Sequence, residues 1–129
     1  MEKLEPVFEL AGRVLLAALF IPAGFSKISG FEGTQGYMEA MGVPGMLLPV
    51  VIALEMGGGL LLIAGYKTKL VALALAGFCL VSGFLFHFQP QDQMQMILFM
   101  KNIAIAGGFL LLVARGSGTF SFDNRFKKA

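Results

Sequence analysis

Residues 70–86 read LVALALAGFCLVSGFLF and contain no charged side chain. Continued to residue 88, this stretch forms a helix about 28 Å long, which is close to the thickness of the hydrocarbon layer of a bilayer. Such a length excludes a β-strand. The composition agrees, because 57% of the residues are apolar and only 14% are charged. A chain of 129 residues is too small to bury so much apolar surface, so we predict an integral membrane protein.

Three other apolar stretches have a similar length, and the four together predict an all-α membrane protein. The predicted spans are residues 7–25, 46–66, 70–88 and 96–114. We therefore expect a single domain, residues 1–129, that folds as a four-transmembrane-helix bundle. Between the first two spans, residues 34–41 predict a short interfacial helix, with Thr34 as its N-cap and Gly42 as its stop.

The distribution of lysine and arginine between the short loops predicts the orientation. The turn after the second span carries Lys67 and Lys69, whereas residues 89–95 carry neither lysine nor arginine. The C-terminal tail adds four more cations, which are Arg115, Arg125, Lys127 and Lys128. We therefore predict that both termini are cytoplasmic and that the interfacial helix lies in the first outer loop. The N-terminal flank lacks a positive excess and an A-x-A cleavage motif, so we expect the first span to be retained.

Six polar side chains in or beside the spans are candidates for a ligand-binding or polar cluster. An ionisable group inside a bilayer costs about 3 kcal/mol or more, so each needs a partner or a purpose. The candidates are Glu55, Lys101, Asn102, Lys27, Arg13 and His87. A rise of about 1.5 Å per residue places all of them except Arg13 in the outer half of the bundle, where we expect them to converge. No catalytic residue is assigned.

A structural role is the alternative for each of these residues. Glu55 and Lys101 differ in depth by about 6 Å, which a lysine side chain can cover, so a buried pair could fix the helix register. Arg13 is the other candidate partner of Glu55, although it lies nearer the cytoplasm and could extend toward water. His87 could be an interfacial residue without chemistry. The single cysteine, Cys79, is predicted to pack as a small apolar residue.

Glycines in the spans predict close helix packing, because small residues let helix backbones approach one another. The helix-packing candidates are Gly24, Gly58, Gly59, Gly65, Gly107 and Gly108. Other classes of site are not indicated: no set of histidine, cysteine and carboxylate has metal-ligand spacing, so no metal is predicted. The net charge of +2 and the lack of a basic patch argue against nucleic acid as a partner.

Several short motifs occur in a fixed order along nearly the whole chain. They are Arg13, AGFSKI at residues 23–28, GVP at 42–44, EMGGGLLLIAG at 55–65, Asn102, GSG at 116–118 and SFD at 121–123. Together they resemble the DoxX family, and most closely its small members from the bacterial inner membrane. The resemblance implies a four-helix, multi-pass membrane fold. The positions that match are Arg13, Gly24, Lys27, Glu55, Gly58, Gly59, Gly65, Asn102, Gly116 and Asp123, whereas His87, Lys101 and Cys79 lie outside the pattern.

The resemblance also implies a link to redox systems, since the family is similar to the small membrane subunit of an archaeal thiosulfate:quinone oxidoreductase and some members associate with thiol and oxidative-stress systems. One hypothesis is therefore a protein that binds a quinone or a similar lipophilic ring, with Lys101 or Lys27 as donor and Glu55 as proton acceptor. Its electrons would pass through a partner oxidoreductase, because the chain has no flavin, haem or iron–sulfur motif. The alternatives are a non-catalytic anchoring subunit and a small transporter, which would need a homo-oligomer to form a pore. Enzymatic activity is left undecided.

Overall fold

The structure of the chain, a computed structural model, describes residues 2–127. Within this range every regular element is helical, and four helical segments are long and apolar enough to cross a bilayer. These segments are Glu2–Ser29, Gly45–Ala64, Thr68–His87 and Gln93–Arg115. Each overlaps one of the four predicted spans, so the prediction of an all-α, four-span membrane protein is confirmed.

Two of the spans combine α-helix with a π-helical segment. The first span is α1 (Glu5–Ser29) after a short turn at Glu2–Leu4, and the fourth is α6 (Gln93–Arg115). The second span consists of a turn at Gly45–Leu47, α3 (Leu48–Ile52), a π-helical segment at Ala53–Gly57 and α4 (Gly58–Ala64). The third consists of α5 (Thr68–Ser82) and a π-helical segment at Gly83–His87. Two short helices, α2 (Phe31–Ala40) and α7 (Phe122–Lys127), lie outside the spans.

The residues at the helix ends explain where the long helices begin and stop. Gly65 ends α4 in the left-handed conformation, with φ of 72°, and Gly116 ends α6 with φ of 84°. These backbone angles are readily adopted only by glycine. At the start of α6, the carboxylate of Asp92 accepts a hydrogen bond from the Gln95 N–H at 3.2 Å and so caps the helix.

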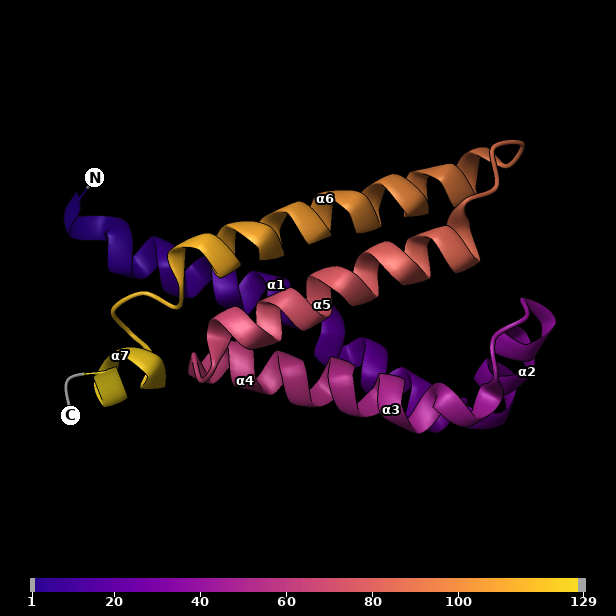
Figure 1. Cartoon of the computed structure of the whole chain (residues 1–129), viewed down its shortest axis with the longest axis horizontal. Helices are drawn as coiled ribbons and strands as arrows, with labels where there is room; N and C mark the ends of the chain where they lie inside the picture. The colour runs from indigo at the N-terminus through magenta and orange to yellow at the C-terminus, as the bar shows by residue number, and fades with distance from the viewer. Residues whose placement is uncertain (1, 128–129) are drawn as a thin grey trace.

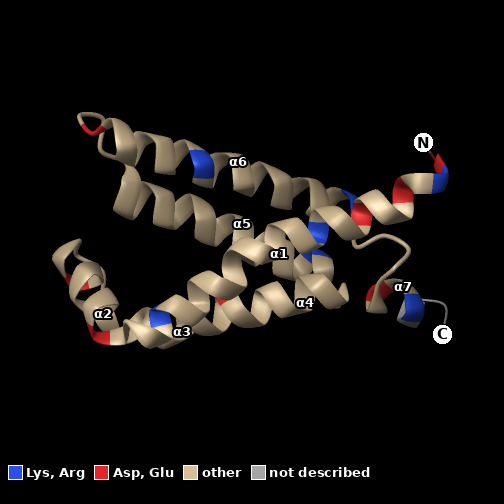
Figure 2. Ribbon diagram, turned by 180° about the vertical axis from the view of Figure 1, so that it is seen from behind, with Lys and Arg blue, Asp and Glu red and all other residues tan. Residues whose placement is uncertain are grey.

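The four spans form two pairs that separate toward one end of the molecule (Figure 1). Helix α1 packs along α4 and the π-helical segment before it, and α5 packs along α6. The pairs meet near both chain termini, which we call the closed end, and diverge toward α2, which we call the open end (Figure 1). Most charged residues lie at these two ends, and only a few lie on the helices between them (Figure 2).

The hydrophobic core lies where the pairs meet. Its centre is formed by fully or almost fully buried side chains, among them Ala17, Phe20, Leu62, Leu75 and Phe109. The rings of Phe20 and Phe109, from the first and fourth spans, lie 5.4 Å apart between centroids. Because these contacts are confined to the closed half, they leave the open half free to hold a cavity.

The predicted packing glycines differ in their surroundings. A Cβ added at Gly59 would lie 2.7 Å from Ile21 Cγ1, and one at Gly24 would overlap Met56, so α1 and the second span approach too closely for any side chain there. Gly58 and Gly65 are also closely surrounded, whereas Gly108 has room in ordinary contact with α1. The prediction for Gly107 is wrong: no atom lies within 4 Å of an added Cβ, because this residue faces away from the other helices.

Helix α2 confirms a helix in the first long link but corrects its start. It begins at Phe31, directly after α1, and Gly30 stands at its N-cap. Thr34 is not the N-cap, because its N–H already donates to Gly30 O at 2.9 Å within the first turn. Gly42, with φ of 82°, follows the helix as predicted.

The C-terminal tail fastens the closed end. Arg13 is fully buried and donates to the carbonyls of Leu62 and Ile63 at 2.9 and 3.2 Å, and also to the carbonyl of Phe120 in the tail. The Asp123 carboxylate accepts hydrogen bonds from the first N–H groups of the α5 end, Lys67 at 2.6 Å and Thr68 at 2.8 Å. We call these two sets of contacts the tail latch.

Candidate functional site

A cavity of about 300 Å³ lies between the two helix pairs in the open half of the bundle. Apolar side chains from α1, α3, α5 and the following π-helical segment form most of its wall, including Phe20, Phe78 and Phe86. Its polar lining consists of Lys27, Thr34, Tyr37, Glu55, Cys79, Ser82, His87, Lys101 and Asn102. Five of the six candidates predicted from the sequence therefore meet at one cavity.

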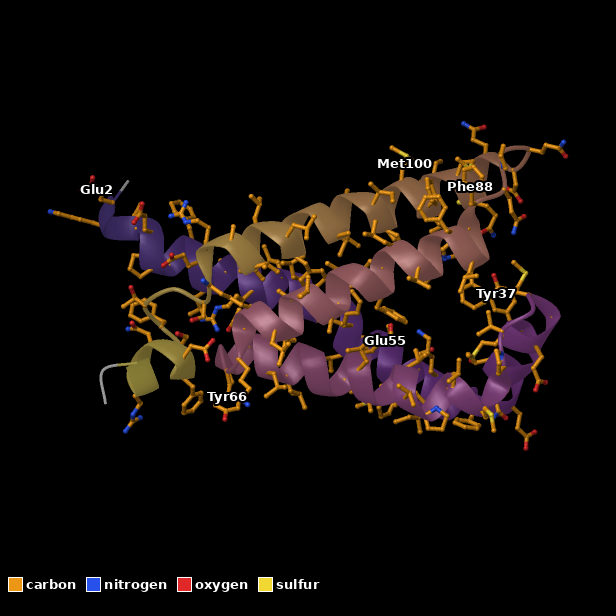
Figure 3. The ribbon with its side chains drawn as sticks, in the orientation of Figure 1. Glu2, Tyr37, Glu55, Tyr66, Phe88 and Met100 are labelled. Atoms are coloured by element: carbon orange, nitrogen blue, oxygen red, sulfur yellow. The ribbon has the colours of Figure 1, made fainter. Side chains whose placement is uncertain are left out.

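The centre of the site is an ion pair between Lys27 on α1 and Glu55 on the second span. Lys27 Nζ lies 2.8 Å from Glu55 Oε1, and the two side chains are 28% and 5% exposed. Glu55 occupies the middle of the π-helical segment Ala53–Gly57 and lies in the gap between the helix pairs (Figure 3). Segments of this kind are frequent at functional sites because they alter the direction of the side chains that follow.

The structure corrects the predicted partner of Glu55. The sequence predicted a pair with Lys101, or else with Arg13, but the nearest cation is Lys27. The rotation of each helix decides the pairing, and α1 packs directly against the segment that carries Glu55, whereas α6 packs against α5.

Arg13 does not reach the cavity. Its guanidinium is held by the end of α4 and by the tail, at the closed end of the bundle. The prediction that it belongs to the polar cluster is therefore wrong, and its contacts are those of a residue that joins three segments. Buried carbonyls at the C-terminal end of a helix are natural acceptors for a cation.

Asn102 and Cys79 connect α6 to α5 on the cavity wall. Asn102 Nδ2 donates to Cys79 O at 3.2 Å and to Ser82 Oγ at 3.3 Å. These bonds fix the position of the polar wall, because the amide spans from one helix to the backbone of the next. Cys79 is 3% exposed and belongs to the hydrophobic core as well as to the lining.

Helix α2 covers the cavity at the open end of the bundle. The Tyr37 ring stacks on Phe86 with 5.3 Å between centroids and points from α2 toward the α5–α6 pair (Figure 3). Beside it, His87 Nδ1 lies 2.8 Å from Gln95 Oε1, which joins the end of the third span to the start of the fourth. Helix α2 is therefore part of the site as well as an interfacial helix.

Lys101 lines the cavity from α6 without a counter-ion. Among the residues that the structure describes, no carboxylate lies within ion-pair distance of its ammonium group. Its neighbour Met100 is 59% exposed and points away from the bundle (Figure 3). The cavity thus has one paired lysine, Lys27, and one unpaired lysine, Lys101.

Sequence reasoning missed several lining residues from α2 and α5. Thr34 and Tyr37 were treated only as parts of an interfacial helix, and Cys79 only as a packing residue. A signal was present on α5, since Cys79, Ser82 and Phe86 follow one another at helical spacing on one face. No comparable signal places α2 over the cavity, because that depends on how the link folds back.

Comparison with known proteins assigns the family. The DoxX family model matches residues 8–88. The chain belongs to the DoxX family. It is similar to inner membrane protein YqjF of Escherichia coli, with 52% identity over 128 residues, which is 99% of this chain and 98% of the relative. Inner membrane protein YphA of the same organism is 35% identical over 93% of this chain and 91% of its own length. No solved structure matches.

A third relative carries a name that refers to redox chemistry. "Putative oxidoreductase CatD" of Bacillus subtilis is 29% identical over 110 residues, which cover 82% of each protein. Together with the four spans, the two inner-membrane relatives identify this DoxX protein as an inner-membrane protein.

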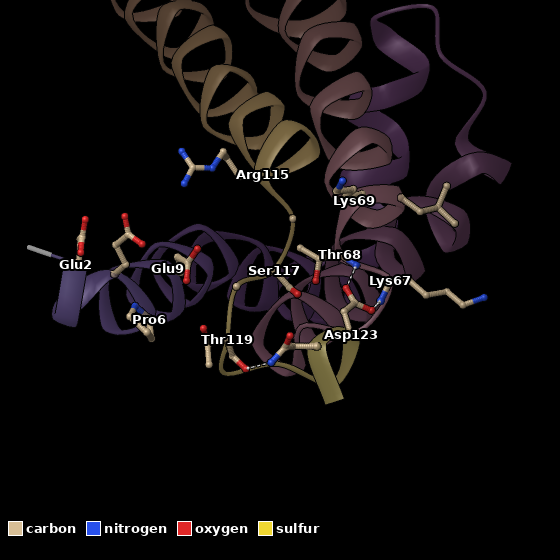
Figure 4. Close-up of a pocket in the computed structure, with 15 residues that line it drawn as sticks. Glu2, Pro6, Glu9, Lys67, Thr68, Lys69, Arg115, Ser117, Thr119 and Asp123 are labelled. Carbon is tan, nitrogen blue, oxygen red and sulfur yellow. Dashed lines mark hydrogen bonds between the residues drawn. The ribbon is translucent and has the colours of Figure 1, made fainter. Parts of the chain in front are cut away.

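A second, wider hollow of about 840 Å³ lies at the closed end of this DoxX protein (Figure 4). Acidic residues of the Glu2–Leu4 turn and of α1 form one wall, and cations of the α4–α5 turn, the first turn of α5 and the end of α6 form the other. They are Glu2, Glu5 and Glu9 opposite Lys67, Lys69 and Arg115. Asp123 also lines it. Burial raises the pKa of Asp123, but hydrogen bonds from Thr68 and Lys67 and the nearby Arg13 lower it more, so that its pKa lies below the ordinary value.

Among the residues that the structure describes, no group of three histidine, cysteine, aspartate or glutamate side chains is placed to hold a metal ion. The chemistry of the open-half cavity in this DoxX protein is therefore that of an ion pair, hydroxyl groups and aromatic rings. Such a lining can hold a ring with polar substituents, donate hydrogen bonds to its oxygens and accept a proton.

Proposed function

We propose that this DoxX protein binds a quinone or a similar lipophilic ring in the open-half cavity and acts with a partner oxidoreductase. The observation that carries the proposal is the Lys27–Glu55 pair, which is held at 2.8 Å inside a cavity between membrane-spanning helices. Ionisable residues within membrane spans are costly and commonly mark a ligand or proton pathway.

The cavity lining fits the chemistry of such a ligand. A volume of about 300 Å³ is at the lower end of the range for small-molecule sites and suits a single ring with its substituents. Phe78 and Phe86 supply apolar walls for the faces of a ring, and the Lys27 ammonium is able to donate to a ring oxygen. A bound quinone supplies two-electron, two-proton redox chemistry.

Glu55 has the position required for handling protons. Its carboxylate is 5% exposed, contacts Lys27, and lines the same cavity. When Lys27 donates to a ring oxygen instead, Glu55 remains beside the ring as the acceptor for a proton. The pair therefore provides one donor and one acceptor within a single ligand's reach.

Two further considerations support a redox role and a partner. The relative named "Putative oxidoreductase CatD" shares most of this chain's length. The sequence carries no flavin, haem or iron–sulfur motif, so electrons must be delivered to or removed from the cavity by another protein. Loop charges predict that the termini are cytoplasmic, and the open end would then face the periplasm, which is where we place the ligand.

The test is retention of an endogenous ligand. We expect protein purified in mild detergent to retain a quinone or related ring, detected by mass spectrometry of the organic extract. Glu55→Gln should reduce the retained amount, because the amide cannot form the ion pair that organises the lining. Glu32→Gln is the matched control, since this exposed carboxylate on α2 does not line the cavity.

The result that contradicts the proposal is equally specific. If wild type, Glu55→Gln and Glu32→Gln retain the same small amount of every lipophilic ring compound, the cavity does not select such a ligand. The polar residues would then serve only to order the bundle, as in an anchoring subunit.

A further inference from the structure

The charges that line the open-half cavity do not balance. Two lysines, Lys27 and Lys101, face it together with one glutamate, Glu55, and Glu55 is already paired with Lys27. The formal charges of these three side chains sum to one positive charge, which is that of Lys101. In a membrane-level cavity such a charge is costly unless an anion or strong acceptors meet it.

Several groups of the lining are free to donate to a ligand. They are the Lys101 ammonium and the hydroxyl groups of Thr34 and Tyr37, whereas the Ser82 hydroxyl already donates to Cys79 O at 3.4 Å. The side-chain carboxylate that could accept, Glu55, is engaged by Lys27. The Asn102 Nδ2 group donates to Cys79 O and Ser82 Oγ on α5, so its hydrogens are already used. A ligand that complements this wall presents oxygen acceptors and brings no additional cation.

Lys101 lies at the edge of the cavity rather than at its floor. Leu19 on α1, which is 41% exposed, and Lys101 on α6, which is also exposed, both belong to the lining. Helices α1 and α6 make few contacts in the structure, in contrast to α5 and α6. A ligand can therefore place its polar head in the cavity while its apolar tail leaves between α1 and α6 into the bilayer.

We infer that the ligand of this cavity is an amphiphile whose oxygen-bearing head carries a single negative charge, and that Lys101 binds this charge. The inference rests on the proposed function, since it names the class of lipophilic ligand that occupies the cavity. One anionic head neutralises the one unpaired cation of the lining. An ionised hydroxyquinone, a fatty acid and an anionic phospholipid share this chemistry.

A matched pair of ligands tests the charge. We would measure binding by isothermal titration calorimetry in nanodiscs of zwitterionic lipid at pH 7. The probes are 3-decyl-2-hydroxy-1,4-naphthoquinone, whose ring hydroxyl is ionised, and 3-decyl-2-methyl-1,4-naphthoquinone, which is neutral. We expect the ionised probe to bind wild type about tenfold more tightly, as for one charge-assisted hydrogen bond at a partly exposed site.

Two variants assign the effect to Lys101. Lys101→Gln should abolish the preference for the ionised probe while leaving the affinity for the neutral probe within about twofold. Lys69→Gln removes the same charge at the closed end, away from this cavity, and should keep the wild-type preference. A circular dichroism melt of each variant checks that it remains folded, because a lysine that only extends to the membrane surface would change stability without changing selectivity.

Competition distinguishes the sources of the anionic head. If decanoate displaces the ionised probe, the head group alone is recognised and a fatty acid is a sufficient ligand. If nanodiscs containing phosphatidylglycerol weaken probe binding, a phospholipid head occupies the site. Both outcomes support an anionic head. If the hydroxyquinone binds and neither competitor weakens its binding, the ring itself is part of what the cavity recognises.

Three results would overturn the inference. If wild type binds the two probes with equal affinity, the cavity does not select an anionic head. If Lys101→Gln keeps the preference for the ionised probe, Lys101 is not the residue that binds this head. In both cases the neutral probe still binds, so the proposed function is retained. If neither probe binds wild type, the proposed function fails and the inference fails with it.

Discussion

Removing Lys27 should destabilise the bundle far more than removing Glu55, because the two side chains differ in burial. At 2.8 Å, and with an effective dielectric constant of about 20, the Coulomb attraction of the pair is about 6 kcal/mol before desolvation is subtracted. Lys27→Met leaves Glu55, whose side chain is 5% exposed, charged and without its partner. Breaking a buried pair in this way costs about 3–5 kcal/mol.

Proton uptake sets an upper limit on this cost. A stranded carboxylate can become neutral, and protonating a glutamate at pH 7 from an ordinary pKa of about 4.3 costs about 4 kcal/mol. We therefore expect Lys27→Met to lower the free energy of unfolding by about 3 kcal/mol at pH 7. Glu55→Leu should cost only about 1 kcal/mol, because Lys27 is 28% exposed and can extend toward water.

The assay is reversible unfolding in mild detergent, followed by circular dichroism for both single variants and the double variant. The double variant should be more stable than the sum of the single costs predicts, by about 2 kcal/mol. Lys101→Met is the control, and its stability should remain close to that of wild type because no carboxylate is described beside it.

Additive costs of the two substitutions would refute this reasoning. If the two single costs sum to the cost of the double variant, Lys27 and Glu55 do not interact energetically. If Lys101→Met costs as much as Lys27→Met, the partner of Glu55 is Lys101, as the sequence alone had suggested.

Three further predictions follow from packing, from the tail and from the loop charges. Gly59→Ala should cost about 1–3 kcal/mol, because the new methyl group would lie 2.7 Å from an α1 side chain, whereas Gly107→Ala, in open space, should leave thermal stability unchanged or slightly raised. The depressed pKa of Asp123 means that its stabilising effect is complete above its unfolded pKa of about 3.9 and is lost as the pH falls through the lower folded pKa. Asp123→Asn should therefore lower the free energy of unfolding by about 1 kcal/mol at pH 7. The free energy of unfolding of this variant should also fall less steeply at acid pH than that of wild type, and an identical acid dependence would contradict the capping role. In a cysteine-free background, a cysteine at Gln91 should react with an impermeant maleimide on intact cells and one at Asn124 should not, with the reverse labelling overturning the predicted orientation.

The spans and the depth of Glu55 could be predicted from sequence because they depend on quantities that are local along the chain. Uncharged runs such as residues 70–86 have a length set by the bilayer, and a fixed rise per residue places Glu55 deep within its span. The meeting of Glu55, Lys27 and Asn102 in one half of the bundle follows from the same counting of residues.

The partner of Glu55 could not be predicted, because pairing depends on helix rotation and on which helices are neighbours. The π-helical segment Ala53–Gly57 widens a helical turn and so changes the direction in which Glu55 points, and hydrophobic periodicity does not locate such a segment. Arg13 was misplaced for a related reason. Its acceptor at Phe120 belongs to a tail whose return path is set by tertiary contacts rather than by local pattern.

The tail latch determines when the closed end can be completed during synthesis. Arg13 lies in the first span to be made, whereas its tail acceptor, Phe120, lies near the end of the sequence. The cap that Asp123 provides for α5 is equally late. A nascent chain that has reached residue 115 therefore contains all four spans but lacks both Phe120 and Asp123. Insertion of the helices and completion of the tail latch are thus separate events in biogenesis, and the second waits for residues 120–123 to emerge.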